Sequence, residues 1–183
     1  MEKKEGKCFS LCSNRRQFLL TSGVATATVI LTGIPGMGTK KVEALTTGYP
    51  RQKIATLSSL KSGKPVEFKY PDSKKFSDSF VVKLGTEAGG GVGPKKDIVA
   101  FNNFCTHMGG KMLEGGFHAA DKAVGPCPYH QSTFDLTRHG IIISGHATES
   151  LGQVLLEVKG NDVYAVSMMG LIYGRYDNLM FKK

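Results

Sequence analysis

The sequence of 183 residues has no run of about 18 uninterrupted apolar residues, which excludes a polytopic membrane protein. It has no tryptophan and only four cysteines, which are Cys8, Cys12, Cys105 and Cys127. The rest of the composition, 40% apolar and 21% charged, is that of a globular chain with one ordinary domain or two very small ones. Its 23 glycines favour turns and short strands over long helices.

Residues 1–44 have the layout of an export signal. A short polar segment leads into Asn14-Arg15-Arg16-Gln17-Phe18-Leu19-Leu20, and a mildly apolar run continues to Ile34. Val42-Glu43-Ala44 then supplies small residues before a cleavage point, as in secretory signals. Paired arginines followed by Phe-Leu are typical of the twin-arginine type. We therefore expect a twin-arginine signal peptide at residues 1–44 and export of the mature chain to the periplasm.

The alternative to a cleaved signal is a retained membrane anchor. Residues 18–34 are short for a membrane span, and they include five Thr or Ser residues and two Gly residues. We therefore expect cleavage, and we expect membrane association only if the signal is retained.

Removal of the signal changes the charge and the cysteine count of the chain. The whole chain has a net charge of +9, and residues 1–44 hold seven basic and three acidic residues, which leaves +5. The remaining charges are scattered, with few aromatics among them, so we expect no nucleic-acid partner. Cys8 and Cys12 leave with the signal, so the mature chain keeps only Cys105 and Cys127.

The mature chain is rich in short β-type runs that alternate with Gly, Pro, Asn and Asp. The predicted strands are Lys53–Leu57, Pro65–Tyr70, Phe80–Leu84, Ile98–Asn102, Ala123–Gly125, Thr133–Asp135, Ile141–Ser144, Val154–Lys159 and Val163–Val166. Gly160-Asn161-Asp162 between the last two is a hairpin signal. No long window shows helical periodicity, so the pattern predicts an antiparallel sandwich or barrel.

Two short motifs carry the candidate metal ligands, Cys105 and His107 in the first and Cys127 and His130 in the second. A zinc finger of the Cys₂His₂ type groups like ligands together, and a haem attachment site needs two cysteines followed directly by His. A [2Fe–2S] cluster with two cysteines on one iron and two histidines on the other fits one ligand of each kind per loop. A structural zinc module, or buried cysteines unrelated to surface histidines, remain as alternatives.

These motifs resemble the two cluster loops of the Rieske iron–sulfur family. The resemblance implies an all-β fold, an antiparallel β-sandwich with a small cluster-binding subdomain at about residues 103–148, and one Rieske-type [2Fe–2S] cluster. Many members of that family join the two loops by a disulfide, at positions that Gly110 and Tyr129 occupy here. We therefore expect packing, backbone hydrogen bonds and the cluster itself to hold the loops.

The resemblance also implies roles for three residues around the cluster. Ser132 matches a serine that hydrogen-bonds a bridging sulfide, and Phe134 stands where high-potential members have a tyrosine. Without that hydroxyl we expect a reduction potential below that of respiratory Rieske proteins. His146 replaces the proline of a third family loop, so it is either an exposed loop residue or a group close to the cluster. No role is expected for His118 or His139.

Longer segments, Cys127–Gly140 and Gly170–Arg175, resemble the small subunit of arsenite oxidase. This resemblance implies an electron-transfer subunit that takes electrons from a large molybdopterin subunit, where the substrate site is expected. The electrons would pass to a periplasmic cytochrome c or a copper protein. We expect Gly170–Met180 either to pack against the large subunit or to form a surface tail.

Two other Rieske classes are alternatives to this assignment. A Rieske subunit of a cytochrome bc-type complex usually has a retained anchor and the disulfide, and the sequence supports neither. A ferredoxin of a ring-hydroxylating dioxygenase is cytoplasmic and has no export signal. The sequence therefore favours the arsenite oxidase type.

Overall fold

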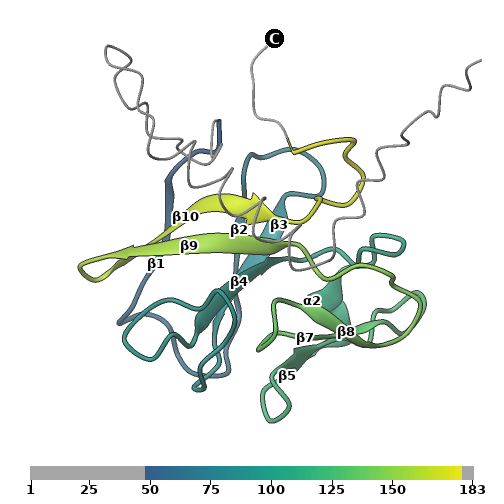
Figure 1. Cartoon of the computed structure of the whole chain (residues 1–183), viewed down its shortest axis with the longest axis horizontal. Coiled ribbons are helices and arrows are strands. Elements are labelled where there is room, and N and C mark those ends of the chain that lie inside the picture. Colours follow the sequence, from purple (N-terminus) through teal and green to yellow (C-terminus); the bar gives the residue numbers. More distant parts are fainter. Residues whose placement is uncertain (1–47, 179–183) are drawn as a thin grey trace, which may run out of the picture. The chain divides into compact units, whose positions relative to one another are not determined.

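The computed structural model describes residues 48–178, so the predicted signal peptide lies outside the described residues. The elements are β1 (Gln52–Thr56), β2 (Val66–Lys69), β3 (Asp78–Lys83), β4 (Ile98–Asn102), α2 (Met112–Gly115), β5 (Phe117–His118), β6 (Ala123–Val124), β7 (Thr133–Asp135), β8 (Ile141–Ser144), β9 (Gln153–Lys159) and β10 (Asp162–Met169). The predicted all-β class is thereby confirmed (Figure 1). None of the helices in this part of the chain is long and apolar enough to cross a membrane.

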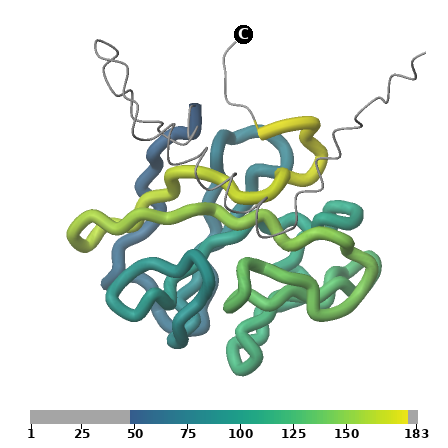
Figure 2. Tube along the Cα trace, viewed as in Figure 1, coloured from purple at the N-terminus to yellow at the C-terminus, as the bar shows by residue number. Residues whose placement is uncertain are grey.

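The strands form two antiparallel sheets. The large sheet has six strands in the order β1-β10-β9-β4-β3-β2, and the small sheet has four in the order β5-β6-β7-β8. The chain leaves the large sheet after β4, builds α2 and the small sheet, and returns at β9, which pairs with β4. The small sheet is therefore an insertion between two neighbouring strands, and its green trace lies beside the rest of the domain in Figure 2.

Strands β3 and β4 are buried on both faces, and their side chains alternate between two apolar cores. Phe80 and Phe101 belong to the first core, while Val81 and Ala100 belong to the second. The first core, called the inner core below, also contains side chains from the inserted segment. These are Cys105, Met112, Val124, Cys127, Phe134, Leu136 and Ala147. The inner core thus joins the small sheet to the large one and includes both cysteines of the described residues.

The hairpin predicted at Gly160-Asn161-Asp162 is present. Asp162 pairs with Lys159, which leaves a turn of two residues, and Gly160 has the positive φ of 62° that such a turn needs. Strand β10 extends to Met169, beyond the predicted end at Val166. The extra residues pair with the start of β9, a tertiary contact that the local sequence pattern does not contain.

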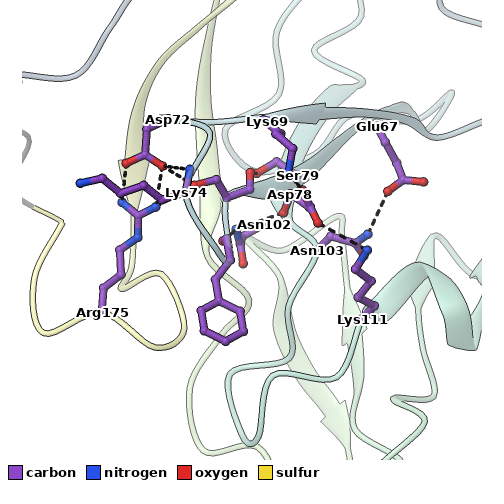
Figure 3. Close-up of polar contacts among 12 residues, drawn as sticks. Glu67, Lys69, Asp72, Lys74, Asp78, Ser79, Asn102, Asn103, Lys111 and Arg175 are labelled. Atoms are coloured by element: carbon purple, nitrogen blue, oxygen red, sulfur yellow. Dashed lines mark hydrogen bonds and ion pairs between the residues drawn. The ribbon is translucent and has the colours of Figure 1, made fainter.

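The described part of the C-terminal segment, residues 170–178, packs on its own domain. Ile172 is fully buried, and the ring of Tyr173 meets that of Phe76 edge-on with centroids 5.0 Å apart. Arg175 donates from both terminal nitrogens to Asp72, at 3.2 and 2.9 Å (Figure 3). The expectation of a plain surface tail is therefore wrong for these residues, because a buried side chain and an ion pair attach them to the domain.

We expect the Arg175–Asp72 ion pair to make stability depend on pH. Burial alone would raise the pKa of Asp72, but hydrogen bonds from Arg175, Ser77 and the Lys74 N–H outweigh it and lower that pKa. The contribution is then complete above the unfolded pKa of about 3.9 and is lost as the pH falls through the lower folded value. Asp72→Asn should cost about 1–2 kcal/mol in urea unfolding at pH 7. The difference from wild type should shrink below about pH 4; a difference that grows on acidification would contradict this.

Candidate metal centre

The two motifs form two loops of similar backbone geometry. The first ligand loop, residues 105–110, follows β4, and the second ligand loop, residues 127–132, leads into β7. In each loop the cysteine N–H donates to the carbonyl five residues later, and the cysteine carbonyl accepts an N–H from four residues later. The four bonds are Cys105 N to Gly110 O (2.9 Å), Gly109 N to Cys105 O (2.9 Å), Cys127 N to Ser132 O (2.8 Å) and Gln131 N to Cys127 O (3.0 Å). Each loop therefore presents its cysteine from a closed, hydrogen-bonded turn.

Two buried asparagines hold the first ligand loop to the large sheet. The Asn102 side chain accepts from the Phe104 N–H at 3.2 Å and donates to the carbonyl of Asp78 at 3.2 Å. The Asn103 side chain accepts from the Leu113 N–H at 3.0 Å, just beyond the loop. In Figure 3 the Asn102 amide lies beside Asp78, and the Asn103 amide also donates to the Glu67 carboxylate on β2. The two asparagines were not predicted to have this role, although two polar residues at the end of an apolar strand are a signal for it.

The two thiols lie at the inner end of the site. Cys105 and Cys127 are each 1% exposed, belong to the inner core and form no disulfide. Burial raises the pKa of the Cys105 thiol, and the neighbouring Cys127 thiol adds to this, while the His107 N–H and the Ser132 hydroxyl act in the opposite direction. Two thiolates at this depth require positive charge beside them, which iron ions supply.

The two imidazoles lie at the outer end of the site. The ring centroids of His107 and His130 are 4.6 Å apart, and the rings are inclined at 75°. His107 is half-buried and its Nδ1 is buried with no hydrogen-bond partner in the described part of the chain, whereas His130 is exposed. A buried ring nitrogen without a partner is costly, and a metal bond would satisfy it. The donor set therefore fits a cluster held by thiolates at one end and imidazoles at the other.

A single metal ion fits this arrangement less well. Within residues 48–178, no group of three or more His, Cys, Asp or Glu side chains is placed to hold one ion. A structural zinc ion needs four such ligands around one point, whereas each iron of a [2Fe–2S] cluster needs only two from the protein. The pairing of two thiols and two imidazoles therefore favours the two-iron cluster over the zinc module.

The positions where related loops carry a disulfide are in contact here without a covalent bond. A Cβ added at Gly110 would lie 2.7 Å from the Cys127 Sγ and 3.3 Å from the ring of Tyr129. The Tyr129 ring and the Cys127 thiol therefore both pack against Gly110. Tyr129 is 61% exposed and Met108, in the first ligand loop, is 53% exposed. The two side chains give the outer end of the site an apolar border.

The three other predicted residues all lie close to the ligand loops. Ser132 is fully buried, and Phe134 is fully buried in the inner core with the two cysteines. His146 is exposed, and its ring centroid lies 5.9 Å from that of His107 and 6.0 Å from that of His130. His146 is thus both an exposed loop residue and a neighbour of the candidate ligands.

The remaining two histidines of the described chain form hydrogen bonds outside the candidate metal site. The His118 Nε2 lies 2.6 Å from the carbonyl oxygen of Gly125, and the His139 Nδ1 lies 2.8 Å from the side-chain oxygen of Gln153. Neither has a ring contact with the candidate ligands. These two histidines therefore serve as controls for substitutions in the site.

The sequence is similar to those of known iron–sulfur proteins. The model of the Rieske [2Fe-2S] domain matches residues 51–168. The chain is 55% identical over 167 residues to "Iodate reductase subunit IdrB" of Denitromonas iodatirespirans, which covers 91% of this chain and 87% of that protein. It is 51% identical over 165 residues to "Iodate reductase subunit IdrB" of Pseudomonas sp. (strain SCT), with 89% and 83% covered.

The fold is also similar to a solved structure. The soluble domain of the Rieske protein II (soxF) from Sulfolobus acidocaldarius superimposes with a TM-score of 0.61 at 23% sequence identity, covering 73% of this chain and 85% of that one. This likeness shows the fold alone. With the family model matched over most of its length, the chain belongs to the Rieske family and carries that family's single [2Fe–2S] cluster.

Proposed function

We propose that this chain is the electron-transfer subunit of an oxidoreductase complex of the iodate reductase type. The observation that carries the proposal is sequence similarity: the chain is more than 50% identical to two iodate reductase subunits, over most of its own length and of theirs. Within this subunit, Cys105 and Cys127 hold one iron of the cluster, and His107 and His130 hold the other. The electron-transfer role is the one expected from the sequence, but it serves an iodate reductase and not the expected arsenite oxidase.

The arrangement of the ligands supports electron exchange with a partner protein. The cluster supplies a one-electron carrier when it is bound. The buried thiols keep their end of the site away from water, while the exposed His130 offers a short path from the site to the surface. The apolar side chains of Met108 and Tyr129 border this path and can be covered by a docked protein. Electrons therefore enter or leave by the imidazole end.

The reaction itself requires a second subunit. Reduction of iodate takes several electrons, and a one-electron carrier delivers them singly to a site where the oxyanion is bound. We propose that a large molybdopterin subunit provides that site, as the sequence resemblance to molybdenum-dependent complexes implies. In this direction the Rieske subunit receives electrons from a periplasmic donor, with a cytochrome c or a copper protein as the candidates.

Arsenite oxidase is the second candidate complex. It is favoured by the resemblance of Cys127–Gly140 and Gly170–Arg175 to the small subunit of that enzyme. The same Rieske subunit would then take electrons from the large subunit and pass them to the periplasmic protein. A cytochrome bc-type complex has less support, because both described cysteines are free and the inter-loop disulfide is replaced by Gly110 and Tyr129.

We also propose that the chain is exported to the periplasm by the twin-arginine pathway. A cluster buried in the inner core is inserted while the chain folds in the cytoplasm, and this pathway carries folded proteins. The Arg15-Arg16 pair before the apolar run supports this route.

The complex purified from its native source should distinguish the two candidate reactions. With the purified complex as catalyst, we expect iodate to oxidise a reduced viologen dye. We expect arsenite to leave an oxidised dye unchanged. The His130→Ala complex should lose dye-coupled turnover, and the His118→Ala complex should retain it. Turnover with arsenite alone would assign the chain to the second candidate, and turnover with neither substrate would contradict both.

Electron paramagnetic resonance of the reduced protein should test the four proposed ligands. Alanine at Cys105, His107, Cys127 or His130 should abolish the Rieske signal, whose mean g value lies below that of the free electron. His118→Ala should keep it, because that ring bonds a backbone carbonyl outside the ligand loops. A full Rieske signal from any one of the four alanine variants would remove that residue from the ligand set.

Phe134→Tyr should raise the reduction potential of the cluster. A hydroxyl placed beside the buried thiols can donate to a ligand sulfur and withdraw electron density from the cluster. The matched control is Phe101→Tyr, which adds the same hydroxyl to a fully buried ring of the inner core, on β4 of the large sheet. Protein-film voltammetry should show a positive shift for Phe134→Tyr that Phe101→Tyr lacks; equal potentials in all three proteins would refute the idea.

A further inference from the structure

A third loop, residues 145–149, forms hydrogen bonds with both ligand loops. The N–H groups of His146 and Ala147 donate to the buried Ser132 hydroxyl oxygen at 3.1 and 3.0 Å. On the other side, the Thr106 hydroxyl donates to the carbonyl oxygen of Glu149 at 2.8 Å. The third loop therefore connects two loops that no disulfide joins.

The third loop lies directly on the backbone of the second ligand loop. Gly145 has a φ of 97°, and a Cβ added there would lie 2.3 Å from the Ser132 Cα. Backbone atoms in that position cannot move aside cheaply, so only glycine fits. This close approach brings the next residue, His146, over the second ligand loop.

The His146 side chain makes its own contact with a candidate ligand. Its Nδ1 lies 3.1 Å from the backbone carbonyl oxygen of His130. A carbonyl can only accept, so the proton of this bond is on Nδ1. In the described chain no backbone N–H donates to that carbonyl, so the imidazole is its hydrogen-bond partner. The His146 ring also lies nearly parallel to that of His107, at an interplanar angle of 22°.

We propose that His146 is a positioning residue that holds the His130 backbone, and with it the outer end of the second ligand loop, in place for the cluster. The inference rests on the proposed function only in taking His130 as an iron ligand. The thiol end of the site is fixed by the inner core, whereas His130 is exposed and belongs to neither apolar core. A bond from His146 restrains the ligand at the point where the core does not reach.

Two substitutions of His146 distinguish the effect of its hydrogen bond to the His130 carbonyl from the effect of having a polar side chain at this position. An asparagine side chain places an amide N–H where the imidazole has Nδ1, so His146→Asn can keep the bond to the His130 carbonyl. A glutamine side chain places its amide near the position of Nε2, so His146→Gln loses that bond at similar polarity. His139→Gln is the matched control, since His139 is an exposed histidine bonded to Gln153.

The measurements are iron release from the oxidised full-length protein to a chelator and the line widths of the reduced cluster's paramagnetic signal. We expect His146→Gln to release iron about fivefold faster, the factor that corresponds to the roughly 1 kcal/mol of one hydrogen bond. Its signal should broaden, because a less restrained ligand adopts a range of geometries. His146→Asn and His139→Gln should match the wild type in both readouts.

Several results would overturn the inference. One is that His146→Gln matches the wild type in iron release and in line width. Another is that His146→Asn releases iron as fast as His146→Gln. If His146→Gln fails to assemble the cluster, normal assembly of His146→Asn supports the inference, and failure of both variants contradicts it. Failure of the ligand assignment is distinguishable, because His130→Ala would then keep the full Rieske signal whatever the two His146 variants do.

Discussion

The burial of two thiols in the apolar core between the sheets is the constraint on which the rest of the site depends. Cys105 and Cys127 are 1% exposed, and they pack with Val124, Phe134 and Leu136. Thiolates at this depth are stable only beside positive charge, and the buried Nδ1 of His107 has no hydrogen-bond partner among the described residues. A [2Fe–2S] cluster supplies positive charge for the thiolates and a ligand bond for the His107 nitrogen. The cofactor therefore stabilises the core and also carries the electron.

The inner end of the site is buried and its outer end is exposed, and electron transfer depends on this difference. The inner end is closed by two sheets, while His130, Tyr129 and Met108 are exposed at the outer end. A carrier needs both properties, because burial protects the cluster and exposure lets a partner approach it. In the outer region, hydrogen bonds from the third loop take the place of a covalent link between the ligand loops.

The sequence predicted what local pattern and spacing encode. Strands β4, β7 and β8 have the predicted bounds, because short runs of β-branched and aromatic residues between glycine and polar breaks define them. Strand β5 has two residues and α2 has four, which is too short for any periodicity to register. The packing of residues 170–178 and the bond from His146 to the His130 carbonyl are contacts between distant segments. Single-sequence patterns do not carry such contacts, although the paired cysteines and histidines indicated the cluster itself.

Mössbauer spectroscopy of the iron-enriched, reduced protein tests the central claim most directly, because it reports the ligands of each iron separately. Two thiolates on one iron and two imidazoles on the other should give two distinct sites, a ferric one with sulfur ligation and a ferrous one with nitrogen ligation. Two equivalent irons, or a protein purified with a single ion, would contradict the account of this site.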